Sequence, residues 1–407
     1  MADGWGARPD PTDPIVTLAL VREVVDGVDR RWERLSFTTL LIGIVLAVGA
    51  CTAPRATPTT DAATPASKPE LPCGGGLIAY VASTFDQSAT TGTVTPVCLS
   101  SGRIARPMAV GGQPFWIVAS SDGHTAYVAN SGWGGPHPQD TVTELDLTTG
   151  RPTRSIPAGL GPMGLALTPN GSTIYVADMG TNLSGDPNSM VAADTVTPVD
   201  TAAGSALHPI TVGPGPGTIA ITPDGRTALV GLDGTPSRPL GEVVPIDLMT
   251  GRVGPSIPTG IAPMGVAITP DGRKALVVNT GWSAIGHTVT PIDLATHTAG
   301  PPIEVGEGPI SIAMTPDGTK AFIAGVLSDV VTPIDVTTDT PLPAIHLSGS
   351  PQYVAMSPNG TTVYTSVSNG TRSGFLVPID ARTDRPGTPI PLPFRGGAIL
   401  ITDTPLG

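Results

Sequence analysis

The chain is poor in charged residues, in aromatic residues and in cysteine. Charged residues make up 13% of its 407 residues, aromatic residues make up 4%, and there are three cysteines. The few charges are mostly acidic, since 33 Asp and Glu against 21 Lys and Arg leave a formal net charge of −12. Phosphate backbones and anionic lipid surfaces repel such a chain, so we expect no nucleic-acid partner.

Several catalytic and nucleotide-binding motifs are missing as well. The sequence has no P-loop, no H-E-x-x-H, no G-x-S-x-G and no C-x-x-C motif. Residues 74–407 show no 3.6-residue apolar period, and the chain's 51 Gly and 46 Pro would interrupt helices throughout. We therefore expect an all-β protein with no cofactor and no metal site, and we prefer a non-catalytic role for it.

A repeat dominates what the sequence does contain. The phrase V-T-P-I-D or a close variant ends at Cys98, Asp146, Asp200, Asp247, Asp293, Asp335 and Asp380. A second phrase, T-P-D-G or a relative, ends at Gly123, Gly171, Gly225, Gly272, Gly318 and Gly360. Apolar runs flank each phrase, so every unit of about 45 residues predicts four antiparallel strands. Seven such units predict a seven-bladed β-propeller.

The two ends of the repeat predict how the ring closes. Residues 77–83 have the pattern of a second strand, so the first unit has no first strand of its own. Residues 397–402 have the pattern of a first strand with no blade after it. We expect this C-terminal strand to complete the first blade, which would leave no open sheet edge and a monomeric ring.

Short phrases after the turns carry a family resemblance. Y-V-A-N at residues 127–130 and Y-V-A-D at residues 175–178 resemble the repeat of the YVTN β-propeller family, and V-V-N-T at 277–280 is a degenerate copy. The resemblance covers residues 74–407. It implies a seven-bladed propeller outside the cytoplasm, with structural relatives among phosphogluconolactonase-like proteins and quinoprotein dehydrogenase subunits.

The N-terminal residues have a different composition. Residues 37–50 form a short apolar run that follows Arg30, Arg31 and Arg34, a pattern typical of an export signal. V-G-A-C at residues 48–51 resembles the lipobox of bacterial lipoproteins, which implies lipidation of Cys51 and anchoring to the outer face of the bacterial cell membrane. An uncleaved N-terminal anchor is the alternative. The predicted parts are a signal at residues 1–50, a Pro/Thr/Ala-rich spacer at 51–73 and the propeller at 74–407.

The cysteine count suggests a disulfide. Lipidation of Cys51 would leave Cys73 and Cys98, and Cys98 stands where every other unit has Asp. We therefore expect a Cys73–Cys98 disulfide between the spacer and the first blade, with two unpaired thiols as the alternative.

Residues that depart from the repeat are better candidates for function than the repeated Asp residues, which are expected to cap turns. The longest insertions, at 131–140, 179–194, 231–241 and 280–286, fall on one face of the predicted ring. Two insertions share a pattern, with Trp133 followed by His137 and Trp282 followed by His287.

The candidate ligand-binding residues on or near this loop face are Trp116, Trp133, His137, Asp178, Asp186, Trp282 and His287. An aromatic ring beside a polar group suits a sugar or another planar ligand, although each Trp could instead pack its own loop.

Three functions fit these features. The preferred hypothesis is a non-catalytic binding or scaffold propeller that presents its loop face to an envelope protein, a glycan or a small ligand. The second is a lactonase-like hydrolase with His137, Asp178, Asp186 and His287 as acids and bases. The third is a redox-associated propeller with a site at the channel mouth.

Overall fold

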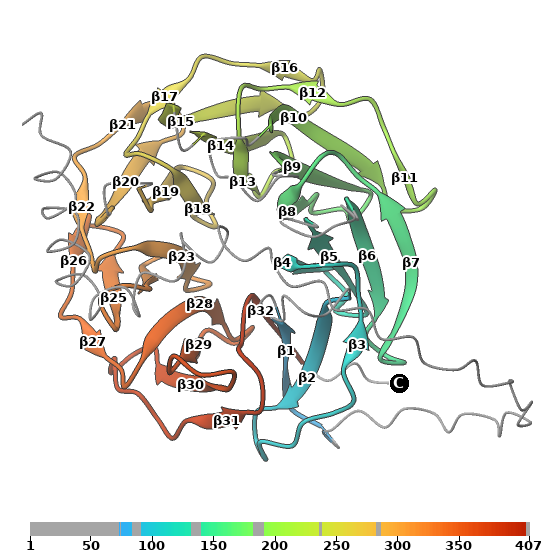
Figure 1. Ribbon diagram of the computed structural model, residues 1–407. Helices are drawn as coiled ribbons and strands as arrows, with labels where there is room; N and C mark the ends of the chain where they lie inside the picture. The colour runs from blue at the N-terminus through green and yellow to red at the C-terminus, as the bar shows by residue number, and fades with distance from the viewer. Residues whose placement is uncertain are drawn as a thin grey trace, which may run out of the picture. The chain divides into compact units, whose positions relative to one another are not determined.

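Apolar runs rich in β-branched residues alternate with glycine turns along the chain, and this pattern folds into antiparallel sheets. The computed structural model describes residue 73 and residues 75–83, 91–131, 140–181, 191–235, 238–281 and 286–403. These residues form seven sheets, the blades of a β-propeller (Figure 1). The predicted all-β, seven-bladed fold is confirmed, whereas the predicted limits at residues 1–50 and 51–73 lie almost entirely outside the described residues.

The blades follow one another in chain order, and the innermost strand of each blade is named first. Blade 1 contains β32 (Ile399–Asp403), β1 (Leu77–Ser83), β2 (Thr93–Cys98) and β3 (Met108–Ala109). Blade 2 contains β4 (Pro114–Ala119), β5 (Thr125–Asn130), β6 (Thr141–Asp146) and β7 (Arg151–Pro157). Blade 3 contains β8 (Pro162–Leu167), β9 (Thr173–Thr181), β10 (Val191–Asp200), β11 (Ser205–Ala206) and β12 (Ile210–Thr211).

The remaining four blades repeat this arrangement. Blade 4 contains β13 (Pro216–Ile221), β14 (Thr227–Thr235), β15 (Arg238–Asp247), β16 (Arg252–Val253) and β17 (Ile257–Pro258). Blade 5 contains β18 (Pro263–Ile268), β19 (Lys274–Asn279), β20 (Thr288–Asp293), β21 (Thr298–Ala299) and β22 (Ile303–Glu304). Blade 6 contains β23 (Pro309–Met314), β24 (Lys320–Gly325), β25 (Val330–Asp335), β26 (Thr340–Pro341) and β27 (Ile345–His346). Blade 7 contains β28 (Ser350–Met356), β29 (Thr362–Ser368), β30 (Gly374–Asp380) and β31 (Ile390–Leu392).

Contacts between innermost strands close the ring. Strand β4 contacts β8, and the series continues through β13, β18, β23 and β28 to β32, which contacts β4 again. Each blade buries both faces of its sheet against its neighbours, which is how a chain with few charges builds a large apolar core.

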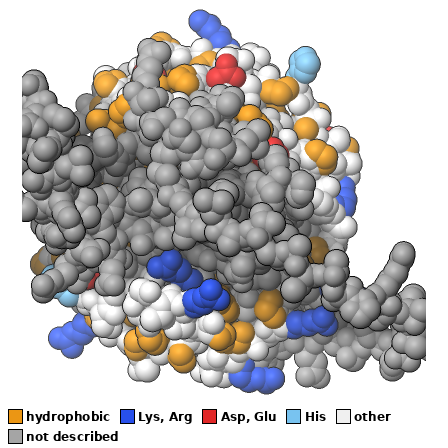
Figure 2. Space-filling model, viewed as in Figure 1, with side chains coloured by type: hydrophobic (Ala, Val, Ile, Leu, Met, Phe, Trp, Pro, Cys, Tyr) orange, Lys and Arg blue, Asp and Glu red, His pale blue; other side chains and the backbone are white. Residues whose placement is uncertain are grey.

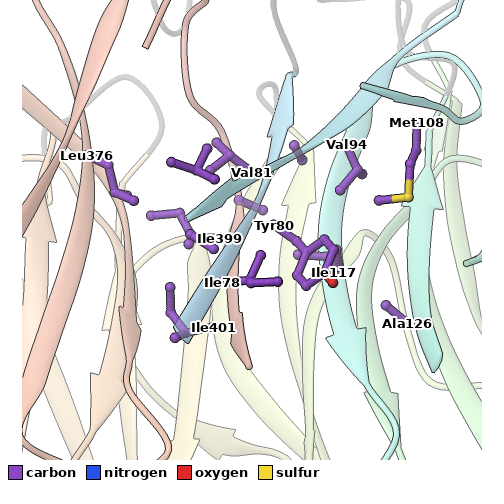
Figure 3. Packing of buried hydrophobic residues seen from close by; sticks show 14 of the residues in the cluster. Ile78, Tyr80, Val81, Val94, Met108, Ile117, Ala126, Leu376, Ile399 and Ile401 are labelled. Carbon is purple, nitrogen blue, oxygen red and sulfur yellow. The ribbon is translucent and has the colours of Figure 1, made fainter. Parts of the chain in front are cut away.

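Blade 1 is assembled from both ends of the propeller. Strand β32 pairs antiparallel with β1, with Leu77 opposite Asp403 and Val81 opposite Ile399. Figure 3 shows Ile399 and Ile401 packed beside Ile78 and Tyr80 around β1. The prediction that the C-terminal strand completes the first blade is confirmed.

A disulfide joins Cys73 to Cys98, the last residue of β2, with 5.4 Å between their Cα atoms. The sulfur of Cys73 lies 3.7 Å from the carbonyl oxygen of Leu77, where β1 begins. The predicted pairing is confirmed, and it fastens the chain that enters blade 1 to the end of its neighbouring strand.

The two ends of the ring differ. We call the end with the loops between second and third strands and the connectors between blades the upper face. The opposite end, with the remaining turns, is the lower face.

On the lower face Asp146 Oδ1 accepts hydrogen bonds from the backbone N–H groups of Thr148 (2.8 Å) and Thr149 (3.0 Å). The third strands of other blades end in the same way, at Asp247, Asp293, Asp335 and Asp380.

The Pro-Asp-Gly turns on this face also use their carboxylates structurally. Asp224 Oδ1 accepts hydrogen bonds from Thr222 Oγ1 (2.6 Å) and from the N–H of Arg226 (3.1 Å). These hydrogen bonds hold the pKa of Asp224 below its usual value, and the bond from Thr222 has the largest effect. The prediction that the repeated Asp residues cap turns is confirmed.

Two lysines fasten neighbouring blades together at the lower face. Lys274 of blade 5 lies 2.9 Å from both carboxylate oxygens of Asp339 in blade 6. Lys320 of blade 6 pairs in the same way with Asp384 of blade 7. Asp339 and Asp384 have φ angles of 55° and 59°, at a turn position where blades 1 to 4 have glycine. The ion pairs offset the cost of this left-handed conformation.

Candidate functional site

The second and third strands of blades 3 and 4 extend further at the upper face than those of blade 2. Strands β9 and β14 have nine residues, and β10 and β15 have ten, whereas β5 and β6 of blade 2 have six. The extra residues continue the ladders, so that Thr181 lies opposite Val191 and Thr235 lies opposite Arg238. We call β9–β10 and β14–β15 the raised hairpins. The described residues of the insertions expected at 179–194 and 231–241, namely 179–181, 191–194, 231–235 and 238–241, are therefore strand, because backbone pairing can continue through small and polar residues.

Glycine-rich connectors hold the bases of the raised hairpins. The carbonyl oxygen of Gly161 accepts a hydrogen bond from the N–H of Met179 (3.1 Å), and that of Leu160 accepts one from Gly180 (2.9 Å). A Cβ on Gly161 would lie 1.8 Å from the carbonyl oxygen of Gly180, so only glycine fits this approach. The signal for these connectors is the phrase G-x-G-P, at residues 159–162, 213–216 and 306–309. Sequence analysis overlooked it.

In blades 2, 3 and 5 a buried Asn or Asp at or near the end of the second strand bonds to two threonines of the third strand, and we call this group the buried polar knot. In blade 5 both the nitrogen and the oxygen of the side-chain amide have hydrogen-bond partners. Asn279 is 1% exposed at the end of β19. Its Nδ2 donates to Thr288 Oγ1 (3.0 Å) and Thr290 Oγ1 (2.9 Å), while its Oδ1 accepts from the N–H of Gly260 (3.1 Å). One amide thus ties the connector, the second strand and the third strand together.

Asp178 takes the corresponding place in blade 3. Its Oδ2 accepts hydrogen bonds from Thr195 Oγ1 (2.9 Å) and Thr197 Oγ1 (2.6 Å). Its Oδ1 is buried and has no hydrogen-bond partner among the described residues. Burial is the main cause that raises the pKa of Asp178 to about 7, and it outweighs the two threonine hydrogen bonds. The arrangement can therefore hold a proton near neutral pH.

Two more carboxyl groups lie near the raised hairpins. Asp140 Oδ1 accepts a hydrogen bond from the N–H of Gly161 (2.9 Å), and partial burial raises the pKa of Asp140. The negative charge of Asp140 adds to the rise in the pKa of Asp178. Asp233, at the base of the second raised hairpin, is fully buried, and burial raises its pKa well above the usual value. Sequence analysis singled out Asp178 but neither Asp140 nor Asp233.

The structure places Trp116 in β4, the innermost strand of blade 2. It is half-buried, and its ring lies 6.2 Å from that of Tyr353 in an edge-to-face arrangement with an interplanar angle of 71°. Tyr353 belongs to β28 of blade 7, so the two rings meet from either side of blade 1. Such a contact stabilises packing by about 0.5–1.5 kcal/mol beyond the buried area.

His287 lies immediately before β20, and its side chain is 54% exposed. Its Nε2 lies 3.3 Å from Glu304 Oε2, in the neighbouring short strand β22. The structure does not bring Trp116, Asp178 and His287 together in any contact that it records, and each stays a predicted ligand-binding residue.

The other predicted site residues lie outside the described part of the chain. They are Cys51, Trp133, His137, Asp186 and Trp282. Within the described part, no group of three or more His, Cys, Asp or Glu side chains is placed to hold a metal ion. In the same part, no helix is long and apolar enough to cross a membrane.

Figure 2 shows the described atoms of one face of the molecule. Hydrophobic side chains appear there in small separate groups among polar ones, with isolated lysines and arginines. Exposed apolar residues on the upper-face connectors include Leu160, at 36%, and Ile261, at 44%. Small groups of this kind are usual on protein surfaces and do not by themselves mark a binding site.

Comparisons with known proteins support the fold. No protein-family model and no curated protein matches the chain. Among solved structures, a hydrazine synthase chain from Kuenenia stuttgartiensis is 25% identical, with a TM-score of 0.54, and the match covers 65% of this chain and 76% of that one. A functionally unknown protein from Desulfotomaculum acetoxidans DSM 771 is 13% identical, with a TM-score of 0.62, over 80% of this chain and 98% of that one. The second likeness shows the fold alone.

Proposed function

We propose that the protein is an extracytoplasmic propeller, anchored to the membrane through Cys51, that binds an envelope protein, a glycan or a small ligand without catalysis. The site of binding is the upper face, at the raised hairpins of blades 3 and 4 and the neighbouring predicted Trp133 and Trp282 loops. One observation carries this proposal. The repeated polar residues of the lower face are used in turns and ion pairs, while the blades differ from one another mainly on the upper face.

The disulfide supports the proposed location. Structural disulfides form and persist in oxidising compartments and are rare in the cytoplasm. The Cys73–Cys98 bond joins the predicted spacer to the ring, so it would keep the tether attached to blade 1 outside the cell membrane.

The proposed upper-face site can be tested with one double variant. The purified protein is screened for binding on an array of envelope glycans and on isolated cell-wall polymer. Trp133→Ala together with Trp282→Ala should abolish binding while leaving the melting temperature nearly unchanged, because substitutions in surface loops, where both residues are predicted to lie, change stability little. Tyr127→Ala is the control, because Tyr127 is a buried aromatic residue packed between blades 2 and 3 and is not a predicted ligand-binding residue; its loss should lower the melting temperature without changing affinity. A double variant that melts several degrees lower and binds as before would assign both Trp residues to packing.

The anchor has a separate test. Cys51→Ala should release the protein from the membrane fraction and change its mass by loss of the lipid. Unchanged mass and unchanged membrane association would refute lipidation and favour an uncleaved N-terminal segment.

A redox-associated role is the second candidate, favoured by the likeness to hydrazine synthase at 25% identity. Elemental analysis and an absorption spectrum of the protein isolated from its native membrane would distinguish the two. A stoichiometric metal or a chromophore would support the redox role.

A further inference from the structure

A groove opens on the lower face where blade 7 meets blade 1. It has a volume of about 400 Å³, and its walls are the β2–β3 turn of blade 1 and the outer part of blade 7. The walls include Leu99 and Ser101 on one side and Tyr364, Pro389 and Ile390 on the other. Thr388, Pro389 and Pro391 are exposed, so the blade 7 wall presents two proline rings to the solvent, whereas Tyr364, which also lines the groove, is buried.

The lysine–carboxylate pair that fastens the two preceding junctions is absent at this one. Thr362 of blade 7 stands in the place of Lys320, and Gly102 of blade 1 stands in the place of Asp384. A Cβ on Gly102 would lie 3.5 Å from Ile390 Cγ2, so the turn of blade 1 comes close to the blade 7 wall at this point. Thr362 and Gly102 cannot form such an ion pair, so this interaction does not cross the junction between blades 7 and 1.

The disulfide places the end of the spacer at the edge of this groove. Cys98 immediately precedes Leu99, the first lining residue. The N–H of Leu99 donates a hydrogen bond to the carbonyl oxygen of Leu77 (3.1 Å), and Cys73 Sγ lies 3.7 Å from the same oxygen. A chain spans at most about 3.6 Å per residue, so the residues just before Cys73 are within reach of the groove.

The composition of those residues suits the groove. Residues 69–72 read Pro-Glu-Leu-Pro. Proline-rich segments favour a polyproline II conformation and dock into shallow grooves lined by aromatic and proline side chains, at a small cost in conformational entropy. Docking within one chain is intramolecular, and the disulfide holds Cys73 beside Cys98, which raises the effective concentration of residues 69–72 at the groove, so a weak contact is enough to fill it.

We propose that residues 69–72 occupy the groove between blades 7 and 1, so that the tether leaves the ring from its lower face. Given the membrane anchor of the proposed function, on which this consequence rests, the lower face would point to the membrane. The raised hairpins would then point away from it, toward a partner in the envelope or outside the cell.

The docking is tested by protease cleavage after Glu70 in the full-length, detergent-solubilised protein with its disulfide intact. Ser101→Trp would fill the groove and should speed cleavage about tenfold, the ratio that corresponds to about 1.4 kcal/mol of docking free energy. Ala203→Trp is the matched control, because Ala203 is also exposed and stands at the same place in the turn of blade 3. It should leave the rate unchanged.

Thr388→Trp, on the opposite wall, gives a second variant in case Ser101→Trp folds poorly, and a melting curve checks the fold of each. Equal cleavage rates in the wild type and in both groove variants would overturn the proposal. The assay does not involve the lipid. If Glu70 is protected from cleavage but the protein is not found in the membrane fraction, the anchor is refuted and the docking stands. If the protein is found in the membrane fraction but Glu70 is cleaved equally fast in the wild type and the groove variants, the docking alone is refuted.

Discussion

Replacing Asp178 by Asn should make the protein more stable at alkaline pH. The same position holds Asn130 in blade 2 and Asn279 in blade 5, and both amides bond to the two corresponding threonines of the third strand. Asparagine therefore fits the site without repacking. The change removes a buried group that can ionise and keeps the contacts with both threonines, whose hydroxyl groups would accept from the amide nitrogen instead of donating to the carboxylate.

The size of the effect follows from the pKa of Asp178, which burial raises to about 7 from an ordinary value of 3.8. A carboxyl group whose pKa is higher in the folded state contributes stability below its unfolded pKa and loses it as the pH rises through the folded pKa. The stability contributed by Asp178 is thus lost between about pH 4, its unfolded pKa, and about pH 7, its folded pKa. A shift of about 3 units corresponds to about 4 kcal/mol, so the advantage of Asp178→Asn should grow by about that amount between pH 4 and pH 8.5.

Urea unfolding followed by circular dichroism at these two pH values measures the effect. The reciprocal variant, Asn279→Asp, is the matched control and should introduce a loss of stability at high pH in blade 5. That loss should be smaller, because the N–H of Gly260 would donate a further hydrogen bond to the new carboxylate. If wild type and Asp178→Asn lose stability in parallel between pH 4 and pH 8.5, the proton is not held at Asp178 and the reasoning fails.

Three further predictions concern the lower face and the ring closure. Lys320→Met should lower the free energy of unfolding by about 1–2 kcal/mol, because it leaves Asp384 half-buried without its ion-pair partner. Asp384→Gly should lower it by less, because glycine adopts the positive φ of this position without strain. Equal urea midpoints for the two variants would contradict this prediction. Deleting residues 396–407 should destabilise the whole ring, so a truncated monomer that melts at the parental temperature would refute the role of β32. Replacing Cys73 and Cys98 by Ser should cost about 3 kcal/mol through the loop that their bond closes, and an unchanged melting curve would show that the bond adds no stability.

The sequence was sufficient to predict the blades, because six of the seven carry their own copies of both turn phrases, which have a fixed chemistry. The closure of blade 1 was predictable for the same reason, since Leu77 begins a strand that lacks its usual predecessor. The turn carboxylates were predictable because the bonds of Asp146 and Asp224 are made within three residues along the chain.

Interactions between residues far apart in the sequence were not predictable. Thr195 and Thr197 hold Asp178 from 17 and 19 residues away, so the pattern Y-V-A-D alone did not separate a buried knot from a catalytic acid. Lys320 meets Asp384 across 64 residues, and nothing local marks the pair. The raised hairpins were missed because their small and polar residues have the composition of loops, while the strand depends on backbone pairing alone.

The shared construction of blade 1 has a consequence for biosynthesis. Because β32 is the last strand of the propeller and pairs with β1, the first, no ring can close until the ribosome has finished residue 403. Six blades can form their own hairpins during synthesis or transport, but β1 and β2 wait with one edge unpaired throughout. Closure of the ring therefore follows the synthesis of β32, on whichever side of a membrane it takes place. Until then the unpaired edge of β1 can pair with other chains, and a chaperone that covered this edge would protect the protein from aggregation.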